Sequence, residues 1–499
     1  MNGRMLVERR RFLLSSLGVL AFSPWAAKAV AHGIAGAQSG AHGSLRLTPP
    51  ASRLNGYSIG LETLDRELFD FKRVLPVLEH LPVKHARIQS GWARCEKAAG
   101  QFDFRWLDDC IDSLLGMGIE PWLNVGYGNP IYMPEAVGRG AVGWVPWYSD
   151  EAMAAWLRYV ELLAQRYGDR VRHFEIWNEP YLPQFWKNAE PNPLHYAKFA
   201  IATMQAMRAK APAIRFAVGG INPGARAMKY TQTFMDAGVA DHADVLTYHF
   251  YSRVPDDHFP QKVESMRKML AQFKRPIALW QGESGAPSQA RTAGALSQYV
   301  WNEQIQAKWL ARRMVMEAWC QVELTSYFHL VDLIARDRKG RMQGSPNFKG
   351  LLRGSDYSPK PAFDVFDTLM RLLQGSAPSE RNFVEFTAAA AGVVGYSFVD
   401  AESRSPDGLP NIFAYWRRGD FEIDDARGLG SVSTRLLLPK QGEKVPTLAG
   451  SGGRSEFVLL DPLSRAVFSI SAGQDKLPLS DSPLFIVSRK KLETLGKIV

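Results

Sequence analysis

The 499-residue sequence predicts an α/β fold, a (β/α)8 TIM barrel followed by a C-terminal β-sandwich. Short strand-like segments alternate with helix-like segments eight times between residues 51 and 375. After residue 375 long helical patterns cease, and Gly, Pro, Asp and Ser separate short strand-like runs. A chain of this length is also too long for one small core. We therefore expect a barrel over 51–375 and a β-sandwich over 376–499.

The expected elements follow one another in the order that such a barrel requires. The strands are Tyr57–Leu61, Lys84–Gln89, Glu120–Val125, Arg172–Trp177, Arg215–Gly219, Val245–Phe250, Ile277–Gln281 and Leu324–His329. The helices are Asp65–Leu81, Trp106–Met117, Ala152–Tyr167, Leu194–Ala209, Tyr230–Ala237, Gln261–Phe273, Ala295–Cys320 and Ala362–Leu373. The sandwich strands are Phe383–Phe386, Val393–Phe398, Ile412–Trp416, Thr434–Leu438, Phe457–Leu460, Ala466–Ile470 and Leu484–Val487.

The first 31 residues have the pattern of a twin-arginine signal peptide. Arg9–Leu13 reads Arg-Arg-Arg-Phe-Leu, an apolar stretch follows through Phe22, and Ala29–Ala31 suits a cleavage site. That stretch is too short to span a bilayer, so we expect no membrane insertion. We expect export by the twin-arginine machinery to the periplasm or beyond, and a flexible stretch over residues 32–50.

Charge and cysteine content exclude several other classes of protein. The formal net charge is +10, of which the leader contributes +4 through five basic residues and one acidic residue. No dense Lys/Arg run indicates a nucleic-acid partner, although an anionic polymer stays open as a substrate. The three cysteines favour inert buried thiols, with a Cys95–Cys110 bridge as the alternative, and no Cys/His spacing predicts a metal site. We expect neither a metal nor an organic cofactor.

Two glutamates stand where predicted strands end. Glu179 follows the fourth strand within the run Glu175–Pro180, and Glu283 follows the seventh strand. Catalytic residues of such barrels lie at the carboxyl ends of the strands. Hydrolysis of a glycosidic bond requires two carboxyl groups, one that donates a proton and one that supports the sugar cation. Asn178 can donate a hydrogen bond to a sugar hydroxyl, whereas Glu175 lies within its strand and is interpreted as structural.

The sequence resembles glycoside hydrolases of clan A, and most closely family 39. The likeness is carried by Glu-Ile-Trp-Asn-Glu-Pro at 175–180, by Glu283, by the His-x-Tyr of His249 and Tyr251 after strand six, and by Arg87 on strand two. The resemblance implies a retaining mechanism with Glu179 as acid/base and Glu283 as nucleophile. It also implies that Arg87 helps to keep the nucleophile ionised.

The end of strand eight departs from the clan pattern, which usually has a tryptophan there. This chain has Phe328 near that position, and we expect it to take the place of the tryptophan under the sugar. The end of strand three, at Tyr127, has no clear match. The residues expected to bind substrate are Asn178, Arg87, His249, Tyr251, Phe328 and Tyr127.

Two long loops have compositions that suit substrate handling. The loop 126–150 is rich in aromatic residues, which either stack on sugar rings or anchor the loop. The loop 331–361 is rich in Lys and Arg, which either attract anionic sugars or form a solvated surface.

The sequence therefore predicts an exported retaining glycoside hydrolase that acts on a poly- or oligosaccharide. Bacterial exopolysaccharide and plant β-glycan are the two substrate classes considered. The alternatives are a glycan-binding protein that has lost turnover, and an endoglucanase similar to those of family 5.

Overall fold

The computed structural model describes residues 43–49, 52–337, 339, 341–386, 392–400, 410–422, 431–436, 457–470 and 476–499. The predicted signal peptide lies outside these residues, as does part of the expected strand Thr434–Leu438. Within the described residues, no helix combines the length and apolar character that crossing a membrane requires.

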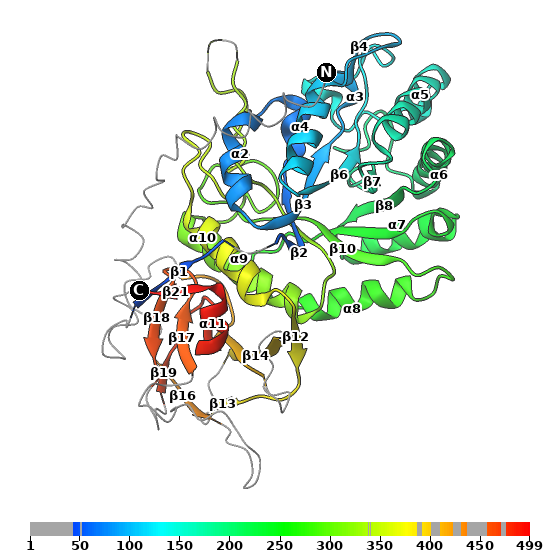
Figure 1. The fold of residues 1–499 in the computed structure, drawn as a ribbon. Coiled ribbons are helices and arrows are strands. Elements are labelled where there is room, and N and C mark those ends of the chain that lie inside the picture. The colour runs from blue at the N-terminus through cyan, green and yellow to red at the C-terminus, as the bar shows by residue number, and fades with distance from the viewer. Residues whose placement is uncertain are drawn as a thin grey trace, which may run out of the picture.

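Eight parallel strands close into a barrel, as predicted (Figure 1). Each strand pairs with the next along the chain, and the last pairs with the first. The strands are β2 (Leu54–Gly60), β3 (Val83–Gln89), β6 (Glu120–Val125), β7 (His173–Ile176), β8 (Arg215–Ile221), β9 (Val245–His249), β10 (Ala278–Ser284) and β11 (Thr325–Tyr327). All eight overlap the expected segments.

Helices cover the outside of the barrel (Figure 1). They are α2 (Phe71–His80), α4 (Arg105–Gly116), α5 (Asp150–Tyr167), α6 (Pro193–Lys210), α7 (Ala225–Asp236), α8 (Phe259–Leu270), α9 (Glu303–Trp319) and α10 (Pro361–Leu373). Between β3 and α4 lie the short helix α3 (Trp92–Cys95) and the hairpin of β4 (Glu96–Ala98) and β5 (Gln101–Phe102).

Two of the predicted helices begin later than expected. Residues 65–70 do not extend α2, because the 3₁₀ helix η2 (Glu62–Arg66) ends at Glu67, whose φ of +53° cannot continue a right-handed helix. Helix α9 begins after Asn302, whose side chain accepts a hydrogen bond from the Ile305 amide at 2.8 Å.

The described strands of the C-terminal part are antiparallel, as predicted, and form two sheets of unequal size. The larger sheet has the order β12 (Ser376–Ser379), β14 (Val393–Asp400), β15 (Ile412–Arg417), β20 (Leu484–Ser488), β17 (Phe457–Asp461), β18 (Ala466–Ser469), β1 (Gly43–Leu47), β21 (Gly496–Ile498). The smaller sheet has the order β13 (Val384–Phe386), β16 (Ser431–Leu436), β19 (Lys476–Pro478). Buried residues from both sheets, including Val384, Phe413, Leu459 and Leu477, form a core between them.

The prediction that residues 32–50 form a flexible stretch is wrong for Gly43–Leu47. These residues form β1, which pairs with β18 on one side and with β21 on the other. The side chain of Leu45 is buried. A five-residue segment gives little periodicity in the sequence, and its pairing partners lie more than 400 residues away.

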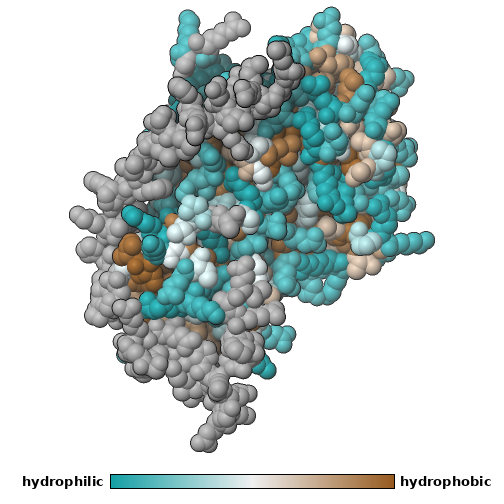
Figure 2. Space-filling model, viewed as in Figure 1, coloured by the Kyte–Doolittle hydropathy of each residue, from teal (hydrophilic) through white to brown (hydrophobic). Residues whose placement is uncertain are grey.

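The barrel and the β domain pack against each other through α9 and α10 (Figure 1). Arg312 of α9 donates to the backbone oxygen of Asp481 at 2.7 Å, and Arg371 of α10 donates to that of Thr48 at 2.7 Å. The described residues of the face in Figure 2 are mainly hydrophilic, with small separate groups of hydrophobic side chains.

Inward-facing residues of the barrel change from apolar to polar along the strands. Trp122 and Trp280 pack edge to face inside the barrel, with ring centroids 5.8 Å apart. Two residues beyond Trp122 on β6, the inward position carries Asn124. Asn124 pairs with Glu175 on β7, and both residues are fully buried. This change places a polar layer directly beneath the carboxyl ends of the strands.

Candidate active site

A sharp turn of the backbone presents Glu179 at the mouth of the barrel. After β7 ends, Trp177 has a φ of +67° and Glu179 a φ of +45°, values that non-glycine residues seldom adopt. Hydrogen bonds hold this turn: the Trp177 indole donates to the Phe185 carbonyl at 2.6 Å, and Asn124 Nδ2 donates to the Trp177 carbonyl at 2.7 Å. The turn directs both Asn178 and Glu179 into the barrel mouth.

Glu283 projects into the barrel mouth from an irregular part of β10. The pairing of β10 with β9 shifts register between Gln281 and Glu283, as in a β-bulge, which changes the direction of the side chain. The hydroxyl of Tyr251 donates to Glu283 Oε1 at 2.6 Å, and Arg87 Nη1 donates to Glu283 Oε2 at 3.0 Å. Glu283 therefore has a donor on each carboxylate oxygen.

His249 lies between the two carboxyl groups. Its Nδ1 is 3.1 Å from Glu179 Oε1 and 3.9 Å from Glu283 Oε2. The two oxygens are therefore separated by no more than the sum of these distances, about 7 Å. That limit accommodates the spacing of about 5–5.5 Å found in retaining glycosidases.

Arg87 lies beneath the site and joins Asn178 with three carboxylates, of which Glu62 and Glu175 are buried and Glu283 is partly buried. Its Nε donates to Glu175 Oε2 at 2.9 Å and its Nη1 to Glu62 Oε1 at 3.2 Å, in addition to the bond with Glu283. Its Nη2 donates to Asn178 Oδ1 at 2.9 Å, which leaves the amide NH2 of Asn178 for a sugar hydroxyl. Glu175 is fully buried within β7 and does not line the cavity described below.

The surroundings shift the pKa values of the two glutamates in opposite directions. Burial raises the pKa of Glu179, against the opposing effect of His249. Burial also acts to raise the pKa of Glu283, but His249, Arg87, the Tyr251 hydroxyl and Lys349 together hold that pKa below its ordinary value. Relative to an ordinary glutamate, the site therefore favours protonation of Glu179 and ionisation of Glu283.

A cavity of about 740 Å³ opens above these residues. Seven of the eight predicted site residues line it, namely Glu179, Glu283, Asn178, His249, Tyr251, Phe328 and Tyr127. The eighth, Arg87, is fully buried beneath it. Phe328 is partly exposed and lines the cavity together with Glu283, at the strand end where clan members usually have a tryptophan.

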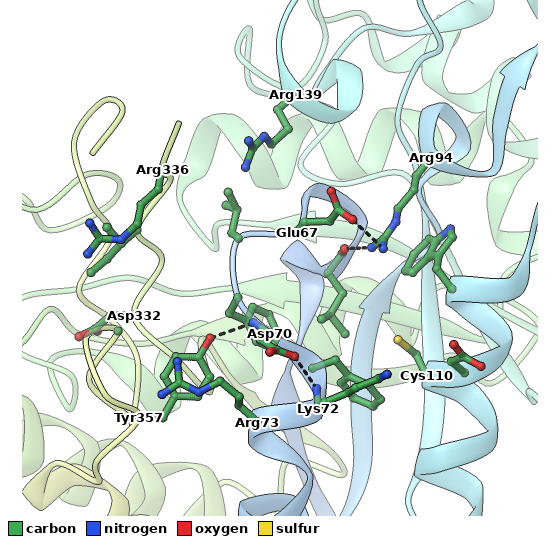
Figure 3. Close-up of a pocket in the computed structure, with 18 of the residues that line it drawn as sticks. Glu67, Asp70, Lys72, Arg73, Arg94, Cys110, Arg139, Asp332, Arg336 and Tyr357 are labelled. Carbon is green, nitrogen blue, oxygen red and sulfur yellow. Dashed lines mark hydrogen bonds and ion pairs between the residues drawn. The ribbon is translucent and has the colours of Figure 1, made fainter. Parts of the chain in front are cut away.

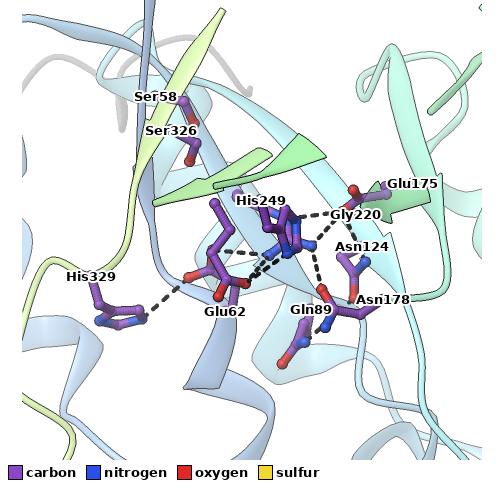
Figure 4. Close-up of polar contacts among 12 residues, drawn as sticks. Ser58, Glu62, Gln89, Asn124, Glu175, Asn178, Gly220, His249, Ser326 and His329 are labelled. Atoms are coloured by element: carbon purple, nitrogen blue, oxygen red, sulfur yellow. Dashed lines mark hydrogen bonds and ion pairs between the residues drawn. The ribbon is translucent and has the colours of Figure 1, made fainter. Parts of the chain in front are cut away.

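Glu62 and Lys349 also line this cavity; Glu62 was not identified from the sequence, and Lys349 was expected only as one of the basic residues of loop 331–361. Glu62 follows β2, and burial raises its pKa to about 7 in spite of Arg87. Its Oε2 lies 3.4 Å from Nε2 of His329, a histidine whose pKa burial lowers to about 3 (Figure 4). Lys349 comes from the loop after β11. Neither residue belongs to a motif, although Glu62 stands just beyond a predicted strand end.

The aromatic residues of loop 126–150 mainly anchor that loop. Tyr132 stacks on Trp92 with ring centroids 5.6 Å apart, and the Tyr148 hydroxyl accepts a hydrogen bond from the Trp186 indole at 3.0 Å. Tyr127 is buried and lines the cavity, where its hydroxyl accepts a hydrogen bond from Gln89 Nε2 at 3.0 Å. Of the predicted aromatic cluster, Tyr127 is the residue in contact with the cavity.

The basic loop 331–361 directs most of its described charges away from the cavity. Arg341 pairs with Asp337, Arg353 with Glu303, and Lys360 with Asp332. Arg338 lies outside the described residues. Lys349 is the basic residue of this loop that lines the catalytic cavity.

A second cavity of about 670 Å³ lies between α2 and the basic loop (Figure 3). Arg73 lies over the ring of Tyr357 at 3.9 Å, and Arg94 over that of Trp106 at 4.3 Å. Leu68 lines both cavities, so the two are neighbours.

The cysteines Cys95, Cys110 and Cys320 are free and buried, so the alternative of a Cys95–Cys110 bridge is not formed.

The protein is a parallel barrel with two carboxyl groups at its mouth, one on the turn after β7 and one on β10. This arrangement is characteristic of glycoside hydrolases. Comparison with known proteins gives the family. The model for "Glycosyl hydrolases family 39" matches residues 92–377, which is more than half of the chain. The chain belongs to glycoside hydrolase family 39.

Parts of the chain are also similar to curated glycosidases. A β-xylosidase from Geobacillus stearothermophilus is 31% identical over 134 residues, which are 24% of this chain and 24% of the relative. β-Glucosidase 1B from Phanerodontia chrysosporium is 30% identical over 105 residues, which are 20% of this chain and 18% of the relative. The chain thus spans a quarter or less of the length of these curated relatives.

A solved family 39 glycoside hydrolase from the gut symbiont Bacteroides cellulosilyticus has the same fold. It superposes with a TM-score of 0.64 at 17% identity, covering 88% of this chain and 81% of that one. The barrel and the C-terminal β domain are therefore both features of a known architecture.

Proposed function

We propose that the protein is a retaining glycosidase in which Glu179 is the acid/base and Glu283 the nucleophile. The observation that carries the proposal is the placement of His249 within 4 Å of both carboxyl groups, whose pKa values are shifted in opposite directions. Such a pair meets the two needs of the reaction, a protonated acid and an ionised nucleophile.

In the first step, Glu283 attacks the anomeric carbon while Glu179 protonates the departing oxygen. Arg87 and Tyr251 hold Glu283 ionised and orient it through hydrogen bonds to its two oxygens. The Asn178 amide donates to a hydroxyl beside the reacting carbon, a contact that strengthens in the transition state. In the second step, Glu179 takes a proton from water, which then hydrolyses the glycosyl-enzyme ester.

The direct test follows reducing-end release from β-glycans and bacterial exopolysaccharides by the mature protein. Glu179→Gln and Glu283→Gln serve as matched variants, since each changes one carboxyl to an amide of the same shape. Release by the parent that is lost in both variants supports the proposal, and the first-formed anomer, read by proton NMR, reports retention. Inversion of configuration would overturn the mechanism.

A glycan-binding protein without turnover has less support. It has no chemical need for two carboxyl groups within about 7 Å, and a cavity of about 740 Å³ gives access to them. Binding of glycans with no release from any of them would favour this alternative. The match to family 39 favours the present proposal over an endoglucanase of the family 5 type.

We further propose a poly- or oligosaccharide as substrate and a periplasmic or extracellular location. The location is supported by the twin-arginine pattern at Arg9–Leu13. Replacing Arg10 and Arg11 with lysine should retain the protein in the cytoplasm, as cell fractionation would report. Unchanged export would contradict the twin-arginine route.

A further inference from the structure

The catalytic cavity contains a buried cation that no described carboxylate neutralises. Lys349 is 1% exposed and lines the cavity together with Glu283. Among the described residues, its Nζ has two hydrogen-bond acceptors, the Ala293 carbonyl at 3.3 Å and Asn347 Oδ1 at 3.4 Å. Both contacts are long, and an ammonium group has three donors. At least one N–H of Lys349 is therefore available to a ligand.

The other buried lysines show what this protein provides for a structural ammonium group. In the described part of the chain, Lys308, Lys360 and Lys491 are also buried, and each has a carboxylate oxygen 2.6–2.8 Å from its Nζ. Lys349 has no described carboxylate within 4.0 Å. A buried charge is costly unless an opposite charge compensates it. A ligand with an anionic group could supply the opposite charge that Lys349 lacks.

The position of Lys349 connects it with the sugar that Glu283 attacks. Its Nζ is 5.7 Å from the ring centroid of Tyr251, whose hydroxyl contacts Glu283 at 2.6 Å. Glu283 acts to raise the pKa of Lys349, although burial lowers that pKa to about 8. Lys349 is thus protonated at neutral pH and close enough to the nucleophile to contact the same sugar.

We propose that Lys349 binds the carboxylate of a uronic acid at the cleaved position, an inference that rests on the proposed glycosidase function. In a pyranose uronic acid, the carbon that bears the carboxylate is joined to the anomeric carbon through the ring oxygen. The carboxylate therefore stays near the nucleophile when the sugar is bound for attack. A neutral aldohexose such as glucose presents a hydroxymethyl group there, which forms a weaker hydrogen bond and leaves the cation uncompensated.

A purely structural role for Lys349 makes a different prediction. The contacts to Ala293 and Asn347 join two loops, and Lys349 also helps to lower the pKa of Glu283. Loss of either effect would weaken the hydrolysis of every substrate by a similar factor. Binding of a carboxylate, in contrast, predicts a loss that is specific to uronides.

The test measures the hydrolysis of two substrates, 4-nitrophenyl β-D-glucuronide and the corresponding glucoside, by the parent and by Lys349→Met. The two substrates differ only in the oxidation state of carbon 6, which is a carboxylate in the glucuronide and a hydroxymethyl group in the glucoside. We expect the parent to prefer the glucuronide in kcat/KM by about 10- to 100-fold, the usual range for a hydrogen bond to a charged group. Lys349→Met should lose that preference through a lower rate on the glucuronide. Arg341→Met is the matched control, because Arg341 belongs to the same loop but pairs with Asp337 at the surface.

Equal losses on both glycosides in Lys349→Met, or a parent that prefers the glucoside, would overturn the inference and leave the glycosidase proposal standing. If neither glycoside is cleaved, NMR is used to follow the binding of glucuronic acid and of glucose. The titrations compare Glu179→Gln with the double variant Glu179→Gln/Lys349→Met. Selective binding of glucuronic acid that requires Lys349 would support the inference on its own. Absence of selective binding would overturn it. Thermal unfolding of Lys349→Met shows whether the variant is folded.

Discussion

Tyr251→Phe removes one oxygen atom that hydrogen-bonds the nucleophile. The Tyr251 hydroxyl donates to Glu283 Oε1 at 2.6 Å and is among the groups that lower the pKa of Glu283. A hydrogen bond to a charged acceptor contributes about 1.5–3 kcal/mol, and one pKa unit corresponds to about 1.4 kcal/mol. We therefore expect the pKa of Glu283 to rise by about one to two units in the variant.

The assay is the pH dependence of kcat/KM on a cleavable glycoside. Below its pKa, Glu283 is protonated and cannot attack, so the acidic limb of the profile should move to higher pH by about one to two units. The alkaline limb, which reports loss of the proton from Glu179, should move less. Because the two carboxyl groups interact, the limbs report apparent pKa values of the pair.

Tyr181→Phe is the matched control for this experiment. Tyr181 also lines the cavity, but its hydroxyl accepts a hydrogen bond from the Asn222 amide at 3.2 Å. Its removal should leave the acidic limb in place. If Tyr251→Phe lowers kcat/KM by one factor at every pH, the hydroxyl acts on the sugar and the reasoning about Glu283 is refuted.

Three other substitutions test separate parts of the structure. Glu179→Gln should lower kcat by about 100-fold or more on an alkyl glycoside but far less on a 2,4-dinitrophenyl glycoside, whose phenolate leaving group departs without protonation. Equal losses on the two substrates would contradict the role of Glu179 as the acid. Asp332→Asn leaves the buried ammonium of Lys360 unpaired and should lower the free energy of unfolding by about 3–5 kcal/mol in urea denaturation; an unchanged midpoint would contradict this. Gly220→Ala places a Cβ 2.9 Å from His249 Cε1 at a φ of +61°, so kcat/KM should fall by about tenfold or more, and full activity would show that His249 can shift freely.

The fold was predictable because its signals are local and repeated. Each barrel strand is a short apolar run between helices with an apolar face, and all eight strands overlap the expected segments. Glu179 and Glu283 could be found because each follows such a run. Both lie at the barrel mouth, as the topology of parallel strands requires.

What could not be predicted depends on contacts between distant residues. Lys349 appeared as one of several basic residues in a loop, and the folded structure alone distinguishes it from Lys360, which has Asp332 as partner. Glu62 lies just beyond β2, but its pKa is raised by burial and by Glu283 against the opposing effect of Arg87, and both of these residues are distant in the sequence. Residue type and spacing do not encode burial of this kind.

Strand β1 links two segments of the larger sheet that lie far from it in the sequence. It pairs with β18 on one side and with β21 on the other, where Leu45 pairs with Ile498 and the Ser44 amide donates to the Val499 carbonyl at 2.7 Å. Removal of β21 would therefore make β1 the edge strand of that sheet. An exposed strand edge is a site for aggregation, so β21 also protects β1 from pairing with other chains.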